Sequence, residues 1–381
     1  MINFGQNRMI KDRISRNIFL FIFFTLTSVI TAQDRPSVEY FLDSTSVTQI
    51  TGDKDELWIA TYGRGVFHYT KKNNSWENFS IAKGNLQQDF FYCISYNKDY
   101  VWAGCSDGLF IYDRKRNIWL KRKFGKGGEM GNWVRALAYD KSINALWIGR
   151  FKFLTKLELG SQRYTDIDLT LNNDAKTNNI KTIKLDGDSL VWFGTEVGVH
   201  RYNKARDIED PASREFLTNK TNNFNGDGDV VSLADMLFES GRIWFGLDEF
   251  VTLQKPKFNV GGVYLYDRKI DWRRFDKTTG LKANGVYCLA RTGNLIWISL
   301  YEFNKNNKAQ MGQGIALINR LTRKVTSISK DELRLQNDKI ISMFFDGENM
   351  WLGTESGILK INLINDFASF KVDSKAPKSR S

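Results

Sequence analysis

Charged and aromatic side chains that follow a recurring Trp motif are the residues of this sequence best suited to chemistry. Acidic and basic groups in such turns could bind a polar ligand through charge-assisted hydrogen bonds. Two of the turns are long insertions, 247–261 and 300–313, which begin alike with Asp248-Glu249-Phe250 and Tyr301-Glu302-Phe303. An aromatic ring nearby could stack against a sugar. The predicted ligand-binding residues are Arg64, Trp133, Arg150, Glu196, Asp248, Glu249, Tyr301, Glu302 and Glu355.

Enzyme chemistry is the competing interpretation of these turns. A carboxylate pair such as Glu196 and Glu355 could supply the acid and base of a glycosidase or polysaccharide lyase. The sequence shows no nucleophile elbow, phosphate-binding loop or metal-binding motif, and two histidines in the chain disfavour His-dependent chemistry. We therefore expect a binding module with no catalytic residue, cofactor or metal, and we keep a carbohydrate-active enzyme as the alternative.

Three weaker candidates have simpler explanations. Residues 223–228 begin like a calcium loop, but the twelfth position is Ala234 instead of Glu, which favours a polar loop. Three cysteines exclude a disulfide framework, so we expect small, partly buried side chains. His68 and His200 occupy equivalent places in the repeats, and we expect both on strand surfaces.

The first 32 residues have the order of a secretory signal peptide. Four basic residues lie between positions 8 and 16, residues 18–24 are apolar, and Ala32 provides a small residue before the expected cleavage site. A retained membrane anchor is the alternative, but the apolar stretch of about 13 residues is shorter than the roughly 20 that a spanning helix needs. We predict cleavage, no later membrane span, and a periplasmic or secreted protein.

Composition and charge limit the partners. The 381 residues are 42% hydrophobic and 26% charged, which is typical of a globular protein. The formal charge of +12 could favour an anionic glycan or a cell-envelope protein. No nucleic-acid-binding motif is present, and export removes the chain from nucleic acid. An oligosaccharide or a cell-envelope protein is the expected partner.

Seven copies of the motif apolar–Trp–apolar–small predict the fold. Successive Trp residues are 44 to 54 residues apart. Each copy lies in a unit of four expected strands, A to D, in which the Trp is on strand B and a polar turn such as Asp186-Gly187-Asp188 separates A from B. Seven such units predict an all-β, seven-bladed β-propeller over residues 33–372. The motif residues are Trp58, Trp102, Trp147, Trp192, Trp244, Trp297 and Trp351.

The Trp side chains are expected to pack between neighbouring blades, and the alternative is a sugar-stacking platform. The small residue two positions later is expected where the blades crowd toward the axis. Ring closure needs a strand from the opposite end of the chain. Residues 38–42 and 367–372 both resemble a D strand, and the sequence leaves open which one closes the ring. Residues 373–381 are predicted to form a disordered basic tail.

These units resemble the two-component regulator propeller repeat over about residues 38–372. The resemblance implies a seven-bladed propeller, commonly the periplasmic sensor half of a hybrid regulator that responds to polysaccharide fragments. Because this sequence shows a single propeller and no kinase domain, the resemblance favours an exported ligand-binding propeller. The fourth unit shows the pattern well, with Asn179, Ile180, Asp186, Trp192, Gly194, Thr195, Gly198, Tyr202 and Asn203.

Overall fold

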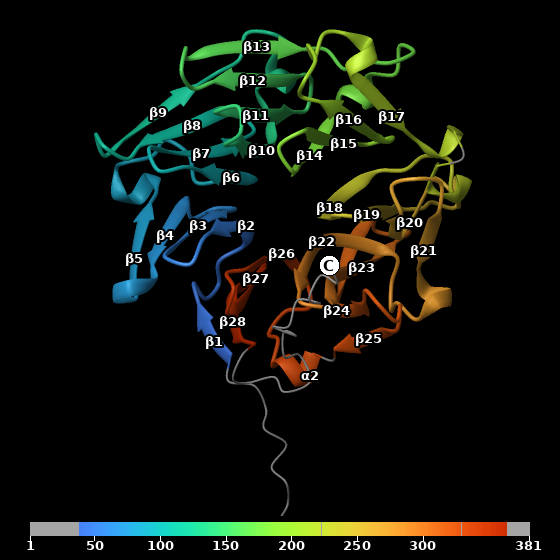
Figure 1. Cartoon of the computed structure of the whole chain (residues 1–381). Coiled ribbons are helices and arrows are strands. Elements are labelled where there is room, and N and C mark those ends of the chain that lie inside the picture. The colour runs from blue at the N-terminus through green and yellow to red at the C-terminus, as the bar shows by residue number, and fades with distance from the viewer. Residues whose placement is uncertain (1–37, 222, 329, 364–381) are drawn as a thin grey trace, which may run out of the picture. The chain divides into compact units, whose positions relative to one another are not determined.

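The computed structural model describes residues 38–221, 223–328 and 330–363. The predicted signal peptide, the possible strand at 367–372 and the C-terminal tail lie outside these residues. Within the described chain, the strands form seven four-stranded antiparallel sheets around a common centre (Figure 1). The predicted all-β, seven-bladed propeller is confirmed.

Each blade runs from an innermost A strand to an outermost D strand. The first four blades are β2 (Val47–Gly52), β3 (Glu56–Thr61), β4 (Val66–Thr70) and β5 (Ser75–Phe79); β6 (Cys93–Tyr96), β7 (Tyr100–Cys105), β8 (Gly108–Asp113) and β9 (Ile118–Arg122); β10 (Val134–Asp140), β11 (Ala145–Arg150), β12 (Leu154–Glu158) and β13 (Arg163–Ile167); and β14 (Ile180–Asp186), β15 (Leu190–Thr195), β16 (Val199–Asn203) and β17 (Arg214–Leu217).

The other blades are β18 (Leu233–Glu239), β19 (Arg242–Phe250), β20 (Asn259–Tyr266) and β21 (Trp272–Phe275); β22 (Gly285–Thr292), β23 (Leu295–Asn304), β24 (Ala309–Asn319) and β25 (Val325–Ile328); and β26 (Ile340–Phe345), β27 (Asn349–Thr354), β28 (Gly357–Asn362) and β1 (Val38–Phe41). Short helical turns connect strands: η1 (Lys71–Asn73), η2 (Ile81–Lys83), η3 (Glu129–Asn132), η4 (Ala175–Asn178), η5 (Pro211–Ser213), η6 (Asn219–Thr221), η7 (Asn223–Gly226), η8 (Lys277–Thr279) and α2 (Lys330–Leu333).

The N-terminal strand β1 closes the ring. It pairs antiparallel with β28, with Val38 opposite Ile361 and Phe41 opposite Ile358 (Figure 1). The ring of Phe41 lies 5.7 Å from that of Trp351, so β1 also contributes to the core of the last blade. The D strand predicted at residues 38–42 is therefore the one that completes blade 7.

The seven motif Trp side chains are at most 1% exposed, so the prediction of core packing is confirmed and the sugar-platform alternative is wrong. The small residue two positions later lies against the next blade. A Cβ atom on Gly149 would approach Ile180 Cγ2 to 2.5 Å, and one on Gly246 would approach Val286 Cγ1 to 2.6 Å. Larger side chains at these positions would push neighbouring blades apart.

A recurring ion pair joins neighbouring blades on the face that carries the A–B and C–D loops. An acidic residue near the end of strand A or the start of strand B accepts from a Lys or Arg that follows strand C of the next blade. At four of these pairs the same carboxylate also accepts from the motif indole N–H. The described pairs are Glu56–Arg114 (2.9 Å), Asp140–Lys204 (2.9 Å), Asp186–Arg268 (2.7 Å), Glu239–Arg320 (2.6 Å) and Asp346–Lys71 (2.6 Å).

The pair at Asp346 should make stability depend on acid pH. Burial alone would raise the pKa of Asp346, but hydrogen bonds from Lys71, Asn349 and Trp351 lower it to about 2. Because the pKa of an unfolded Asp is about 3.9, the stabilisation is complete above that pH and is lost as pH falls toward 2. We expect Asp346→Asn to lower the free energy of unfolding by about 2 kcal/mol at pH 7 and by much less at pH 2.5.

Urea unfolding at the two pH values measures this difference. Glu348→Gln is the matched control, since Glu348 is exposed in the same turn and should change stability little. An equal loss for Asp346→Asn at both pH values would contradict the assignment.

Candidate functional site

One residue near the start of each A strand lies outside the regular strand ladder. In six blades the pairing of strands A and B shifts by one residue at this place. Such a β-bulge re-aims a side chain, and here it turns the side chain toward the axis. In blade 2, Tyr92 occupies the same place and its N–H donates to Gly104 O over 2.9 Å. The residues are Thr48, Tyr92, Arg135, Lys181, Ala234, Tyr287 and Ile341.

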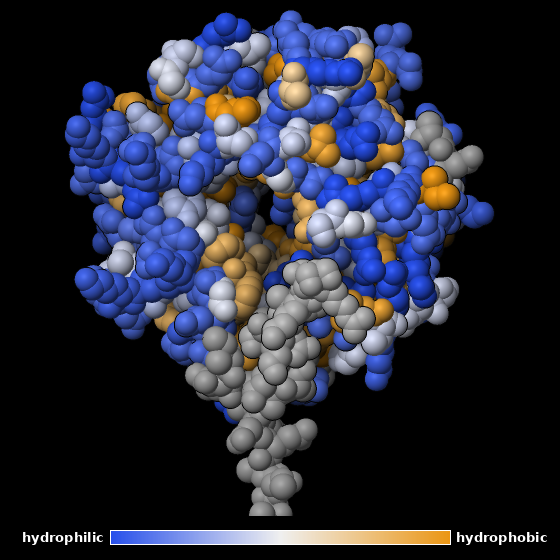
Figure 2. Space-filling model, in the orientation of Figure 1, coloured by the Kyte–Doolittle hydropathy of each residue, from blue (hydrophilic) through white to orange (hydrophobic). Residues whose placement is uncertain are grey.

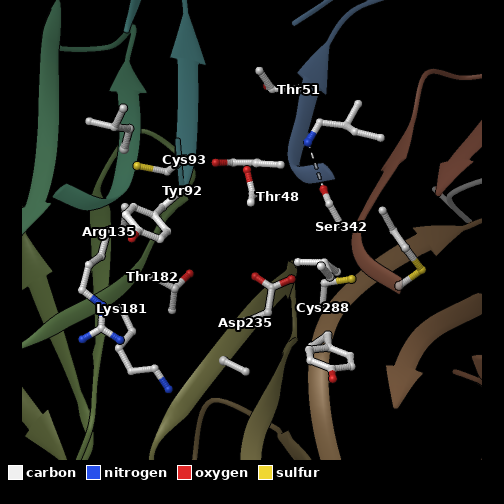
Figure 3. A pocket seen from close by; sticks show the side chains of 18 of the residues that line it. Thr48, Thr51, Tyr92, Cys93, Arg135, Lys181, Thr182, Asp235, Cys288 and Ser342 are labelled. Carbon is white, nitrogen blue, oxygen red and sulfur yellow. Dashed lines mark hydrogen bonds between the residues drawn. The ribbon is translucent and has the colours of Figure 1, made fainter. Parts of the chain in front are cut away.

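These residues line a cavity of about 340 Å³ at the axis of the ring. Figure 2 shows the hollow at the centre of one largely hydrophilic face, and Figure 3 shows side chains from the A strands around it. Several polar groups in it bind neighbouring blades: Ser342 Oγ accepts from Ile50 N (2.9 Å), and Asp235 accepts from Leu289 N (2.8 Å) and Lys184 Nζ (2.8 Å). The cavity thus contains groups already used to hold the ring together.

A second cavity, of about 310 Å³, opens beside the first on the side that carries the B–C and D–A loops. We call it the rim pocket. Arg135 and Lys181 line both cavities, so the two are adjacent, and Figure 3 shows these two side chains next to each other. Its volume is at the lower end of the range for small-molecule sites. The walls include the predicted residues Glu196, Asp248, Glu249 and Tyr301.

Paired charges form one wall of the rim pocket. Lys181 Nζ donates to Asp248 and to Ser232 Oγ (2.8 Å), and Ser232 Oγ donates to Asp248 Oδ2 (2.7 Å). Arg135 donates to Glu196 Oε1 over 3.4 Å. Burial and the Arg135 guanidinium lower the pKa of Lys181. Both cations therefore stand in a partly dehydrated setting, where hydrogen bonds to a ligand are strengthened.

The insertions of blades 5 and 6 form a second, joined wall. Both are extended B–C hairpins, because the pairing continues to Phe250 opposite Asn259 and to Asn304 opposite Ala309. The Glu249 carboxylate accepts from Phe303 N over 2.9 Å, and burial raises the pKa of Glu249. The Phe250 and Phe303 rings lie 4.7 Å apart. The two hairpins thus act as one unit.

Two buried side chains of this wall differ in how their polar atoms are satisfied. The Tyr301 hydroxyl is fully buried and accepts from Glu249 N over 2.9 Å. Asn259 is 6% exposed and lines the rim pocket, yet its Oδ1 has no hydrogen-bond partner among the described residues. An unsatisfied buried acceptor costs about 1–3 kcal/mol. A hydroxyl or amino group of a ligand could satisfy it.

Arg150 corrects the sequence-based expectation. Its side chain is 0% exposed instead of lying in an exposed turn. The guanidinium forms an ion pair with Asp166 (2.7 Å), donates to Gly131 O (2.7 Å), and lies 4.6 Å from the Phe124 ring centroid. We therefore assign Arg150 a structural role within blade 3.

Four other predicted residues lie outside the rim pocket lining. Arg64 donates to Thr45 Oγ1 over 2.8 Å in blade 1. Glu302 is half exposed and pairs with Lys277 (3.0 Å). Glu355 pairs with Lys339, so the structure does not place it with Glu196 in the lining of one pocket. Trp133 stacks on Phe151 at 5.3 Å with an interplanar angle of 4°.

The weaker candidates are also placed. The three cysteines are buried, as predicted. His200 is 1% exposed and bonds Thr177 O (2.8 Å), and burial lowers its pKa to about 4, so the expected surface position is wrong. His68 is partly buried and bonds Glu56 (2.7 Å). In the loop at 223–228, Asp227 accepts from Tyr264, and no cluster able to hold a metal occurs among the described residues.

Sequence reasoning missed Arg135, Lys181, Ser232 and Asn259. The first two could have been found by aligning the seven A strands, because both occupy the bulge position. Ser232 and Asn259 have no such signal, since their role depends on how blades 4, 5 and 6 meet.

The fold and site define a seven-bladed propeller with a polar pocket beside its axial cavity. No protein-family model matches the chain, and no curated protein matches it in sequence. The extracellular domain of the putative one component system BT4673 from B. thetaiotaomicron, also described as a hybrid two component system, aligns with a TM-score of 0.61 and 20% identity over 86% of this chain. The alignment covers 40% of that domain, so this chain spans about two fifths of its length.

Two further solved structures share the fold. PorZ, a surface component of the type-IX secretion system of Porphyromonas gingivalis, has a TM-score of 0.60 and 13% identity over 85% of this chain and 47% of that one. Virginiamycin B lyase from Staphylococcus aureus has a TM-score of 0.58 and 13% identity over 86% of this chain and 99% of that one. These likenesses confirm the seven-bladed propeller fold that the repeats predicted. None of the helices among the described residues is long and apolar enough to cross a membrane.

Proposed function

We propose that this chain is an exported binding or sensing propeller that takes a hydroxyl-rich ligand, the end of an oligosaccharide, in the rim pocket. The observation that carries the proposal is Asn259, which lines this pocket and whose buried amide oxygen has no partner among the described residues. Around it, ion-paired Lys181 and Arg135 and the ring of Phe258 supply donors and an apolar surface. Sugars present hydroxyl groups beside apolar ring faces, which suits such a lining.

The likeness to extracellular domains supports export and sensing. Two of the three carboxylates that line the rim pocket support binding over catalysis: Glu196 and Asp248 are held in ion pairs with Arg135 and Lys181. Carboxylates that already bind cations can position those donor groups for a ligand, which suits a binding site.

A glycan array followed by calorimetric titration of the purified protein tests the proposal. Glu196→Gln should weaken binding of the selected oligosaccharide about tenfold. Glu355→Gln is the matched control, since Glu355 occupies the equivalent repeat position, also forms an ion pair, and lies outside the rim pocket. Failure to bind any glycan would refute the function, and equal effects of the two substitutions would refute the site.

The same samples test the enzyme alternative, because a lyase shares this fold. Chromatography of the glycan after incubation should recover it unchanged. Release of shorter products, lost in both Glu196→Gln and Glu355→Gln, would favour the two-carboxylate enzyme.

A further inference from the structure

Five aromatic side chains form a continuous row beside the rim pocket. They come from B–C turns and D–A connections of blades 1 to 3, and therefore lie on the same face as the rim pocket. Neighbouring ring centroids are 4.8, 5.9, 5.6 and 5.3 Å apart. We call this the aromatic row; in order, it comprises Phe90, Tyr62, Tyr92, Trp133 and Phe151.

The outer end of the aromatic row is exposed but rigid. Tyr62 is 49% exposed and Phe90 is 44% exposed. An isolated antiparallel bridge joins the two residues, Tyr62 N donates to Ser46 O (2.8 Å), and Phe91 N donates to Thr61 O (2.9 Å). Large apolar side chains held in place at the surface are available for contact at little entropic cost.

The inner end of the aromatic row meets the rim pocket at Arg135. The Arg135 guanidinium lies 5.5 Å from the ring centroids of both Trp133 and Phe151, and it donates to Glu196 in the rim pocket. Tyr92 lines the axial cavity beside Arg135 (Figure 3). The buried Trp133 Nε1–H has no hydrogen-bond partner among the described residues. The aromatic row thus ends at Arg135, which also lines the rim pocket.

We propose that the aromatic row is a second subsite, on which successive sugar rings of a linear oligosaccharide stack while its terminal unit occupies the rim pocket. This inference rests on the proposed function and adds that the ligand is a chain. Aromatic side chains suit the C–H faces of sugar rings. Because Arg135 contacts the inner end of the row and lines the rim pocket, both subsites lie within reach of one molecule.

An extended peptide is the other polymer that could lie on such a row. Peptides commonly bind by adding a strand to a free sheet edge. Here the N–H groups of Tyr62 and Phe91 already donate to Ser46 O and Thr61 O. The aromatic row therefore offers aromatic side chains instead of a strand edge, which favours the sugar chain.

Calorimetric titration with a length series of the selected glycan, from one to six sugar units, tests the inference. Affinity should rise with length in the unmodified protein. Phe90→Ala and Tyr62→Ala should each lower the affinity for the longest glycan about tenfold and leave that for the shortest unchanged. Leu120→Ala is the control, because Leu120 is 50% exposed on the outer strand of blade 2. Both row side chains are exposed, so thermal unfolding should shift little.

The outcomes separate the two proposals. Affinity that does not depend on length, with no effect of Phe90→Ala or Tyr62→Ala, overturns the second subsite and leaves the rim pocket in place. Absence of binding for every length overturns the proposed function and this inference together. Loss of binding to an aromatic or proline-rich test peptide in the row variants, with glycan binding unchanged, identifies a peptide site and also overturns the inference.

Discussion

Replacing Arg150 with alanine should lower the free energy of unfolding by about 3–5 kcal/mol, because it leaves Asp166 without its buried partner and opens a cavity. The guanidinium bonds Asp166 and Gly131 O, and it lies 4.6 Å from the ring centroid of Phe124 and 5.6 Å from that of Phe153. Phe153 has a φ of +74°, a conformation that favours glycine, so the surrounding contacts must hold this turn.

Urea unfolding of the purified protein measures the loss. The double variant Arg150→Met, Asp166→Asn should recover part of it, since the methionine refills the cavity and no unpaired carboxylate remains at position 166. Ligand affinity of whatever fraction stays folded should be unchanged. A loss of less than about 1 kcal/mol in the free energy of unfolding, or a loss of ligand binding without a loss of stability, would contradict the structural role and indicate that Arg150 binds the ligand.

Replacing Asn259 with leucine should weaken ligand binding about tenfold or more while leaving the protein equally stable or more stable. The substitution removes a buried acceptor that no described residue satisfies, so folding loses no hydrogen bond of that oxygen. The ligand, in contrast, loses the group that we expect to accept from its hydroxyl. A substitution that raises stability and lowers ligand affinity indicates a residue that serves binding and not folding.

Thermal unfolding and calorimetric titration of the same samples give both quantities. Asn306→Leu is the control, because Asn306 is exposed near the tip of the blade 6 hairpin. A fall in stability of more than about 1 kcal/mol for Asn259→Leu, or unchanged affinity, would contradict the role given to Asn259.

The repeat explains why the fold could be predicted in detail. Each B strand carries a Trp followed by a small residue, and both are needed for the contact of one blade with the next. This contact is local, and its sequence pattern recurs seven times. The strand that closes the ring could be identified only from the structure, because two terminal segments had the same strand pattern. Pairing of β1 with β28 is a contact between distant parts of the chain, and strand propensity alone does not choose between such partners.

The candidate site was only partly predictable, because sequence shows charge but not burial. Arg150 and Glu196 look alike as charged residues after a Trp strand, yet one side chain is buried against Asp166 and the other faces the rim pocket. The two insertions bring Asp248, Glu249 and Tyr301 together in the rim pocket, whereas Glu302 from the same segment lies outside its lining. Asn259 could be identified only from the structure, in which the pairing of β19 with β20 places it in the wall of the rim pocket.

A crystal structure of the protein with the tightest-binding oligosaccharide from the array tests the central claim most directly. Electron density for a sugar unit in the rim pocket, with a hydroxyl within hydrogen-bonding distance of Asn259 Oδ1, is the predicted result. Density on the opposite face, among the ion pairs that join the blades, would contradict the account.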